Sequence, residues 1–244
     1  MKRALLIVML LLLMATPLHA ADLVGKIKGM QVVKSLFGDQ VKVLEAKDLG
    51  NIYEVVASVP GRDKQIVYVT KDGSYLITGG NLVNKEKVNL TKERYDEVNK
   101  VDVSKLPVQD AITIKKGTGA KKLYLFTDVD CPYCKKAWEW LRGQTDYTAY
   151  VFLFPLDMHP NAAEKSVKVL CDANPEAAFD ATETDQPLTA AKCEKGEQLL
   201  QKHKAISTEV GVSGTPLIIL GNGVKMSGFN QKALEGYLKG QESK

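Results

Sequence analysis

Residues 123–134 read LYLFTDVDCPYC, and this segment says more about the architecture than any other part of the chain. Its apolar beginning, Leu123–Phe126, is typical of a buried strand, and two cysteines follow with only Pro132 and Tyr133 between them. Proline is favoured at the first position of a helix, where its missing N–H costs nothing. We therefore predict a strand followed by a helix that runs from Pro132 to Arg142.

Cys131 and Cys134 are placed at the start of this predicted helix. Unpaired backbone N–H groups and the helix dipole favour a negative charge there, so Cys131 is expected to be a thiolate near neutral pH. A thiolate attacks disulfides, and a second thiol three residues on can release the product, which indicates thiol–disulfide exchange. We predict Cys131 as the more exposed nucleophile and Cys134 as the shielded, resolving thiol.

Two other uses of a Cys-x-x-Cys segment fit the rest of the sequence less well. A zinc site needs a second close Cys or Cys/His pair, but Cys171 and Cys193 are far apart and neither histidine nearby has ligand spacing with them. A purely structural disulfide over so short a span would not need the strand–CPxC–helix context. We expect neither a metal nor an organic cofactor.

The N-terminus has the features of a cleaved secretory signal. Lys2 and Arg3 precede the unbroken apolar stretch Ala4–Met14, and the small residues Ala20 and Ala21 follow. The apolar stretch is too short to span a bilayer comfortably, so we expect cleavage near Ala20 and export to an oxidising compartment. A retained membrane anchor is the alternative interpretation.

Charge and cysteine count narrow the class of protein further. The chain has 33 basic and 29 acidic residues, and loss of the signal removes only Lys2 and Arg3 among them. That balance is too close to neutral to favour nucleic acid or an anionic surface as a partner. An even number of cysteines in an exported protein favours pairs. Three pairings are possible, of which we favour an exchangeable 131–134 pair and a structural 171–193 pair.

Residues 21–83 are expected to form a small N-terminal domain. Apolar residues at helical spacing predict a helix over Asp22–Phe37 that ends at Gly38. Four short β-like runs follow at residues 40–46, 51–57, 65–70 and 74–78. Asp72-Gly73 predicts a hairpin, because glycine accepts the positive φ of a tight turn. A domain of this size buries little apolar surface. It is therefore expected to self-associate or to pack on the rest of the chain.

Residues 84–106 are polar and charged and are expected to form a linker helix. Thr91 is predicted as its N-cap, and a sparse apolar stripe of Tyr95, Val98 and Val101 follows. Such a stripe suits a helix that bridges two domains better than a core helix.

From residue 107 to residue 244, strands and helices alternate. After the strand and helix around the cysteines, we predict a strand at 148–154, a helical insert at about 160–210, a hairpin at 216–227 and a helix at 230–239. The insert is expected to open with a capping box at Asn161–Glu164, to break at Asn174-Pro175 and to continue through Cys193. This order is typical of an α/β thioredoxin fold with an inserted helical subdomain.

Gly214-Thr215-Pro216 lies at the start of the strand predicted after the insert. A cis bond before Pro216 would bring the Thr215 backbone beside Cys131, where it could pair with an extended segment of a client protein. An ordinary trans proline at a strand edge is the alternative. Asp128 and Asp130 just precede Cys131 and are interpreted as solvated loop acids, with a role in moving protons or in opposing thiolate formation as the alternative. His159 and His203 are interpreted as surface residues.

Together these segments resemble the bacterial periplasmic disulfide isomerases of the DsbC/DsbG type. The resemblance rests on Phe126-Thr127-Asp128 before the CPYC motif, on Gly211–Pro216 and on the second cysteine pair, and it covers the whole chain after the signal. Pro132-Tyr133 between the cysteines is similar to DsbG. The second cysteine pair and the Gly-Val-Ser-Gly-Thr-Pro segment are similar to DsbC.

The resemblance implies a V-shaped homodimer joined through α+β N-terminal dimerisation modules, with an apolar cleft for misfolded or mis-oxidised exported proteins. It also implies a periplasmic location and a DsbD-like membrane thiol reductase that keeps the catalytic pair reduced. The implied site residues are Cys131 and Cys134 for catalysis, Pro132, Tyr133, Thr215 and Pro216 for client contact, and Cys171 and Cys193 for a structural disulfide.

We therefore expect a protein disulfide isomerase, or thiol-disulfide oxidoreductase, that isomerises or reduces incorrect disulfides in exported proteins. Two alternatives stay open: a DsbG-like reductase of sulfenylated cysteines, suggested by Pro132-Tyr133, and a holdase chaperone whose thiols are incidental. A net oxidase is expected if the potential of the cysteine pair is strongly oxidising.

Overall fold

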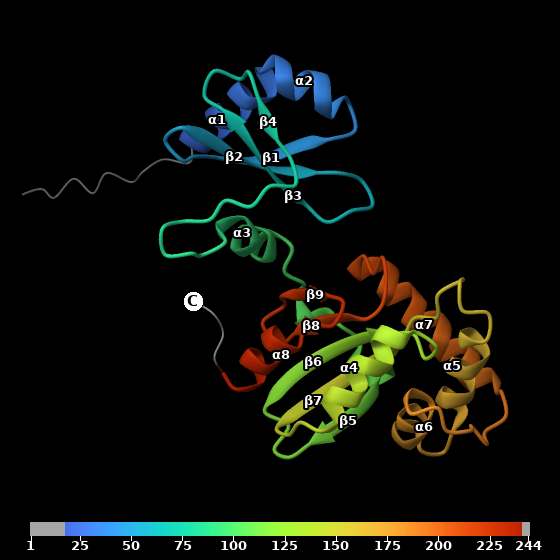
Figure 1. The fold of residues 1–244 in the computed structure, drawn as a ribbon. Helices are drawn as coiled ribbons and strands as arrows, with labels where there is room; N and C mark the ends of the chain where they lie inside the picture. The colour runs from blue at the N-terminus through green and yellow to red at the C-terminus, as the bar shows by residue number, and fades with distance from the viewer. Residues whose placement is uncertain (1–17, 241–244) are drawn as a thin grey trace, which may run out of the picture. The chain divides into compact units, whose positions relative to one another are not determined.

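The computed structural model describes residues 18–240, and their contacts divide the chain between Thr91 and Lys92 into two compact units (Figure 1). Most of the expected signal sequence, residues 1–20, lies outside the described residues. Within residues 18–240, no helix is both long enough and apolar enough to cross a membrane.

The N-terminal unit packs two short helices on one face of an antiparallel sheet of order β1-β2-β3-β4. Its elements are α1 (Leu18–Gly29), α2 (Gln31–Phe37), β1 (Lys42–Asp48), β2 (Ile52–Ser58), β3 (Gln65–Thr70) and β4 (Leu76–Ile77). Alternate residues of a strand point to the same face, and here they are apolar. The core comprises Ile27, Val33, Val43, Tyr53, Val55, Val67 and Val69.

The helix predicted over Asp22–Phe37 is divided in two. Met30 has extended backbone angles, with φ −67° and ψ 136°, and separates α1 from α2 directly after Gly29. Glycine has a low helix propensity, so the break falls at a weak point of the apolar pattern. The helical spacing on both sides of the break explains why one continuous helix was a reasonable prediction.

The turn between β3 and β4 forms at Asp72-Gly73, as predicted. Gly73 has a φ of 70°, in the left-handed region that favours glycine, and its N–H donates to the Thr70 carbonyl at 2.9 Å. The Asp72 carboxylate accepts the Thr70 hydroxyl at 2.5 Å and the Ser74 N–H at 3.0 Å. These hydrogen bonds lower the pKa of the Asp72 carboxyl to about 2.

Helix α3 (Leu90–Val98) is shorter than the linker helix predicted over residues 84–106, and Thr91 is not its N-cap. Thr91 is the second residue of the helix. Its hydroxyl accepts the Leu82 N–H at 2.7 Å and shares a 2.5 Å hydrogen bond with the Tyr68 hydroxyl. The side chain therefore ties down the segment before the helix instead of capping the helix itself.

The C-terminal unit is built on a mixed sheet of order β5-β7-β6-β8-β9 (Figure 1). The central strand β6 is parallel to β7 and antiparallel to β8. The strands are β5 (Ile112–Lys116), β6 (Lys121–Thr127), β7 (Tyr147–Leu153), β8 (Leu217–Leu220) and β9 (Lys225–Ser227). The helices are η1 (Val103–Lys105), η2 (Val108–Asp110), α4 (Pro132–Arg142), α5 (Ala162–Cys171), α6 (Pro175–Glu183), α7 (Glu194–Val210) and α8 (Gln231–Leu238).

Strand β5 has no counterpart in the sequence prediction. It pairs antiparallel with the edge of β7, with Ile112 opposite Val151 and Ile114 opposite Ala149. Ile112 and Ile114 are buried and Thr113 between them is exposed, which is the alternation expected of a strand. Only five residues carry this pattern, so it is short enough to be read as a loop.

The helical insert differs from the prediction at two helix starts. Asn161 has backbone angles near the helical region, φ −96° and ψ −9°, and its side chain makes no cap. Glu164 instead pairs with Lys168 at 2.8 Å, so there is no capping box. The helix predicted through Cys193 is interrupted, because Pro187 disfavours helical angles before it. Cys193 is the N-cap of α7 instead of an interior helical residue.

Aromatic side chains contribute to two separate core clusters of the C-terminal unit. In the cluster that contains no α4 residue, Phe126 of β6 stacks on Phe152 of β7, with ring centroids 5.0 Å apart. On α4, Trp138 is buried and meets Phe179 of α6 edge-on, with centroids 4.9 Å apart. Trp140, two residues later, is only partly buried, as expected for helix positions that face different ways. Trp138 thereby packs α4 against α6 of the insert.

Candidate active site

Cys131 and Cys134 lie where the central strand β6 leads into α4. Cys131 is the N-cap of α4 and Pro132 occupies its first turn, as the sequence predicts. The Cys134 N–H donates to the Cys131 carbonyl at 3.0 Å, so one turn of helix carries both sulfurs. Both thiols are free, and Cys131 is 5% exposed against 1% for Cys134. Cys131 is the more accessible sulfur, by a small margin.

The loop at Thr215 contacts Cys131 from the neighbouring strand. The Thr215 carbonyl oxygen is 3.5 Å from Cys131 Sγ, and the Thr215–Pro216 peptide bond is cis, as expected. The sheet explains this contact: β8 runs antiparallel to β6, and Leu217 is paired with Phe126. The start of β8 therefore lies at the same end of the sheet as the cysteines.

The structure thus brings four predicted site residues together, namely Cys131, Cys134, Thr215 and Pro216. The other two, Pro132 and Tyr133, are exposed on the first turn of α4, and Tyr133 keeps 68% of its surface accessible. A second exposed apolar side chain, Met158, lies in the segment between β7 and α5.

Cys134 is enclosed, and its burial disfavours the thiolate form. Burial raises the pKa of the Cys134 thiol far above its usual value, whereas the neighbouring hydroxyls of Thr127 and Thr215 act in the opposite direction. Thr127 is itself buried at the end of β6. The buried thiol must therefore lose its proton before it can attack a disulfide.

Asp128 is a fully buried carboxylate, so its interpretation as a solvated surface acid is wrong. Its oxygens accept the Asp130 N–H at 2.7 Å and the Leu156 N–H at 2.6 Å, and one oxygen lies 2.9 Å from His159 Nδ1. Three partners compensate for the water that the carboxylate has lost. Asp128 thereby ties the loop before Cys131 to the segment after β7, and His159 is drawn out of solvent with it.

Asp130 and His203 also differ from the prediction. Asp130 is largely covered and pairs with Lys165 of α5. His203 is fully buried: its Nδ1 accepts the Leu153 N–H at 3.0 Å, and its Nε2 donates to the Asp110 carbonyl at 2.7 Å. Burial lowers the pKa of His203, so it is a neutral structural link between α7 and the sheet. Among residues 18–240, no three His, Cys, Asp or Glu side chains gather as metal ligands would.

Glu183, which the sequence analysis did not single out, belongs to the same site. It lies in the last turn of α6 with 4% of its surface exposed, and its Oε1 accepts the Thr127 hydroxyl at 3.5 Å. Burial raises the pKa of Glu183 to about 8, the charge of Lys135 lowers it, and that of Cys131 raises it further. Glu183 is thus a buried acid with a raised pKa close to the free cysteine pair.

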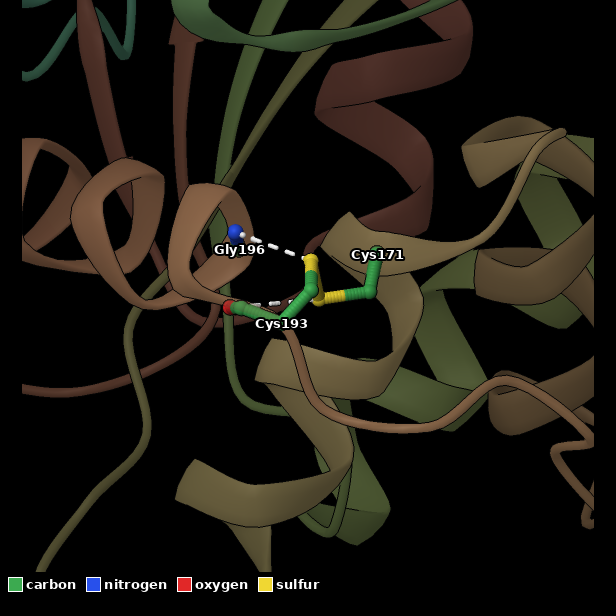
Figure 2. Close-up of a disulfide and its surroundings, with 3 residues drawn as sticks. All are labelled: Cys171, Cys193 and Gly196. Atoms are coloured by element: carbon green, nitrogen blue, oxygen red, sulfur yellow. Dashed lines mark hydrogen bonds between the residues drawn. A yellow bond between two sulfur atoms is a disulfide. The ribbon is translucent and has the colours of Figure 1, made fainter.

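The second cysteine pair forms a disulfide between Cys171, at the end of α5, and Cys193, at the start of α7 (Figure 2). Their Cα atoms are 5.8 Å apart, and Cys193 Sγ accepts the Gly196 N–H at 3.3 Å. A Cβ atom on residue 196 would lie 2.4 Å from Cys171 Sγ, so glycine permits the close approach of α7. The bond joins two helices of the insert.

Two known domain families match the chain. The disulfide bond isomerase protein N-terminal domain, DsbC_N, matches residues 26–92, and the thioredoxin-like domain matches residues 108–241. The second match covers more than half of the chain. The predicted fold class, an α+β N-terminal module followed by an α/β thioredoxin fold, is confirmed.

Individual relatives agree with these matches. The chain is 29% identical over 162 residues to the probable thiol:disulfide interchange protein DsbC of Bordetella avium, covering 66% of this chain but only 57% of that protein. It is 28% identical over 173 residues to the thiol:disulfide interchange protein DsbC of Escherichia coli K12, covering 67% and 68%. A crystal structure of the disulfide interchange protein from Neisseria gonorrhoeae has 27% identity and a TM-score of 0.51, covering 57% of this chain and 100% of that one. The chain therefore belongs to the thioredoxin-like domain family, and its residues 26–92 match the N-terminal domain of disulfide bond isomerase proteins.

Proposed function

We propose that this chain is a thiol:disulfide interchange enzyme that isomerises or reduces incorrect disulfides in exported proteins. The observation that carries the proposal is the free cysteine pair on the first turn of α4, with Cys131 Sγ 3.5 Å from the Thr215 carbonyl oxygen. The names of the DsbC relatives, which are called thiol:disulfide interchange proteins, support the same activity.

In this mechanism the Cys131 thiolate attacks one sulfur of a client disulfide. A bond forms between Cys131 and that sulfur, and the other client sulfur leaves as a thiolate. In isomerisation, a different client thiolate then displaces Cys131, and the client gains a new disulfide. In reduction, Cys134 attacks Cys131 instead, and the client leaves with both of its sulfurs reduced.

The client is held beside Cys131 by the loop and by the exposed turn of α4. The backbone at Thr215 lies at a strand start next to Cys131, where it can pair with an extended client segment as an added strand. Pro132 and Tyr133, which are exposed on the first turn of α4, offer apolar surface next to Cys131. Apolar contact suits clients that expose core residues because they are misfolded.

The proposal extends to location, domains and partners. Residues 1–20 are assigned to a signal cleaved near Ala20, and the mature protein to the periplasm, where a DsbD-like membrane thiol reductase keeps the Cys131–Cys134 pair reduced. Residues 21–83 are assigned to dimerisation, 84–106 to the linker and 107–244 to catalysis. Five large apolar side chains exposed in the N-terminal unit support a partner surface there: Leu36, Leu44, Tyr75, Ile77 and Val83. A monomer mass by light scattering would contradict the homodimer.

Refolding of scrambled, fully oxidised ribonuclease tests the activity. We expect the purified protein to restore ribonuclease activity, and Cys131→Ala to restore none above the uncatalysed rate. The matched control is Cys171→Ala/Cys193→Ala, which removes the other two sulfurs and should act like the wild type per folded molecule. The proposal fails if Cys131→Ala refolds ribonuclease as fast as the wild type does.

A second candidate is the reduction of sulfenylated cysteines, which Pro132-Tyr133 favours through its similarity to DsbG. In that reaction Cys131 attacks a sulfenic acid and releases water, so no second client cysteine is needed. Clients trapped on Cys134→Ala distinguish the two reactions. Partners with several cysteines support isomerisation, and partners with a single cysteine support sulfenic acid reduction. A holdase would suppress client aggregation equally well without either active-site thiol.

A further inference from the structure

The loop between β6 and α4, residues 128–131, determines where the nucleophilic sulfur lies. Cys131 Sγ is 3.5 Å from the carbonyl oxygen of Thr215, which lies just before β8. That distance therefore depends on how the loop is held against the rest of the sheet. The Cys131 N–H donates to the Asp128 carbonyl oxygen at 3.0 Å, so the loop is a tight turn that begins at Asp128. The contacts that fix Asp128 also fix Cys131.

The side chain of Asp128 is fully buried and fastens this turn on two sides. One oxygen accepts the Asp130 N–H at 2.7 Å, inside the loop itself. The other oxygen lies 2.6 Å from the Leu156 nitrogen and 2.9 Å from His159 Nδ1. A carboxylate can only accept, so both of these nitrogens donate to it. Asp128 thereby joins the loop to the connection between β7 and the helical insert, residues 154–161.

The connection that holds Asp128 is itself fixed to the sheet. The Phe154 N–H donates to the Thr127 carbonyl oxygen at 2.7 Å, which continues the pairing of β7 with β6 up to the loop. The His159 N–H donates to the Leu156 carbonyl oxygen at 2.9 Å, so the two donors to Asp128 belong to one hydrogen-bonded turn. The loop is therefore attached to an ordered segment that is anchored beside it.

The other carboxylate of the loop is held in a different way. Asp130 pairs with Lys165 of α5, and the two side chains keep 18% and 42% of their surfaces exposed. A partly exposed ion pair contributes little to stability, because water competes for both charges. Loss of the buried Asp128 carboxylate, by contrast, would leave its donors without their acceptor. Asp128 and Asp130 carry the same charge in the same loop, so comparing them separates hydrogen bonding from charge.

We propose that Asp128 and His159 are positioning residues for the nucleophile: they hold the 128–131 loop so that Cys131 Sγ faces the backbone that receives the client. The inference rests on the proposed function. Neither side chain takes part in a bond that forms or breaks when Cys131 attacks a client disulfide. Their effect is on the place from which the sulfur attacks.

Position matters more for a client than for a small reagent. A client segment that pairs with the backbone at Thr215 is held in one orientation, so the Cys131 sulfur must meet its disulfide from one direction. A small alkylating reagent is not held and can approach the sulfur from any open side. A displaced loop should therefore slow attack on a paired client strongly and alkylation only slightly. A change in the charge of the sulfur would slow both reactions.

Two reactions of Cys131, measured side by side in the full chain, test the proposal. Both use the Cys134→Ala background, in which Cys131 is the remaining free thiol. The first is attack on an extended cysteine peptide blocked with nitrothiobenzoate, which releases a coloured thiolate. The second is alkylation by iodoacetamide, followed by mass spectrometry. Both rates are expressed per folded molecule, so that a loss of stability alone changes neither.

Asp128→Asn should slow attack on the peptide about 10²-fold, as expected for a displacement of about 1 Å. It should slow alkylation by less than about threefold, because iodoacetamide needs no partner at Thr215. His159→Leu should slow the attack about 10-fold, because Asp128 keeps its other two donors. His159→Asn should restore most of that loss, because the asparagine amide nitrogen can donate in the place of Nδ1.

Asp130→Asn is the matched control: it removes the same charge from the same loop and should slow neither reaction more than about twofold. The inference is overturned if Asp128→Asn behaves like Asp130→Asn, if it slows attack and alkylation equally, or if His159→Asn is as slow as His159→Leu. Should Asp128→Asn fail to fold, the two His159 variants still give the answer. Absence of any attack on the peptide by Cys134→Ala itself would instead overturn the proposed function.

Discussion

The two cysteine pairs of this chain begin from the same position in a helix and end in different chemical states. Cys131 is the N-cap of α4 and Cys193 is the N-cap of α7. The Cys193 sulfur accepts the Gly196 N–H and is bonded to Cys171, so both of its partners lie in the helical insert. The Cys131 sulfur makes no cap hydrogen bond and faces the Thr215 carbonyl. The helix start is common to both, but the sulfur of Cys193 has a covalent partner and the sulfur of Cys131 is free.

The largest effect is expected from removing the sulfur at the exchanging helix start. Cys131→Ala should reduce the exchange of client disulfides to the uncatalysed rate, because the remaining thiol, Cys134, is 1% exposed and cannot reach a client disulfide. Unfolding in denaturant should change by less than about 1 kcal/mol, because the lost sulfur makes no cap and no disulfide. A variant that keeps a measurable fraction of wild-type exchange would show that the two pairs do not differ as described.

Removing the other pair should give the opposite result. Cys171→Ala/Cys193→Ala should lower the free energy of unfolding by roughly 3 kcal/mol, because the disulfide no longer restricts the unfolded chain. Exchange activity per folded molecule should stay at the wild-type level. Denaturant unfolding and the ribonuclease assay on the same samples measure both quantities. Loss of activity without loss of stability would reverse the assignment of the two pairs.

The close packing at the disulfide gives a finer test. Gly196→Ala would place a Cβ atom 2.4 Å from Cys171 Sγ and 2.8 Å from the Val167 carbonyl oxygen. We expect a destabilisation of about 2 kcal/mol, as for other overpacked sites. The penalty should be smaller when the same change is made in Cys171→Ala/Cys193→Ala, because one of the two obstructions is then gone. Equal penalties in both backgrounds would show that the sulfur is not the obstacle.

The buried acid Glu183, which lies near the Cys131–Cys134 pair, should make the free energy of unfolding depend on pH. The pKa of Glu183 is about 8 in the folded protein, above its ordinary value of 4.5. Between these values the folded protein holds a proton that the unfolded chain has released, so Glu183 makes the protein less stable as pH rises from 4.5 to 8. Glu183→Gln should remove this slope, which is at most about 1.4 kcal/mol per pH unit. Parallel stability curves for the two proteins would contradict the raised pKa.

Local patterns allowed the elements around the cysteines to be predicted, but not the surroundings of the polar side chains. The bounds of α4 agree with the prediction because the CPYC motif contains its own helix start. Two of the three partners of Asp128, Leu156 and His159, come from the chain after β7, which no local pattern places beside it. The partners of His203 and Glu183 could not be predicted for the same reason.

The sequence did contain a signal for both missed residues. Glu183 lies four positions after the buried Phe179, and His203 lies three positions before the buried Ile206, so each falls on the apolar face of its helix. A titratable residue on such a face is buried by its helix whatever it contacts. The identity of the contact, Thr127 or Leu153, depends on how the insert packs on the sheet.

A redox titration that follows each pair separately is the most direct test of the difference between them. The protein is equilibrated in glutathione buffers of increasing oxidising strength, its free thiols are alkylated, and its peptides are weighed by mass spectrometry. We predict that Cys131 and Cys134 pass from dithiol to disulfide across the series while Cys171–Cys193 stays oxidised throughout. Reduction of Cys171–Cys193 at or before the point where the Cys131–Cys134 pair is reduced would contradict the division into an exchanging and a structural pair.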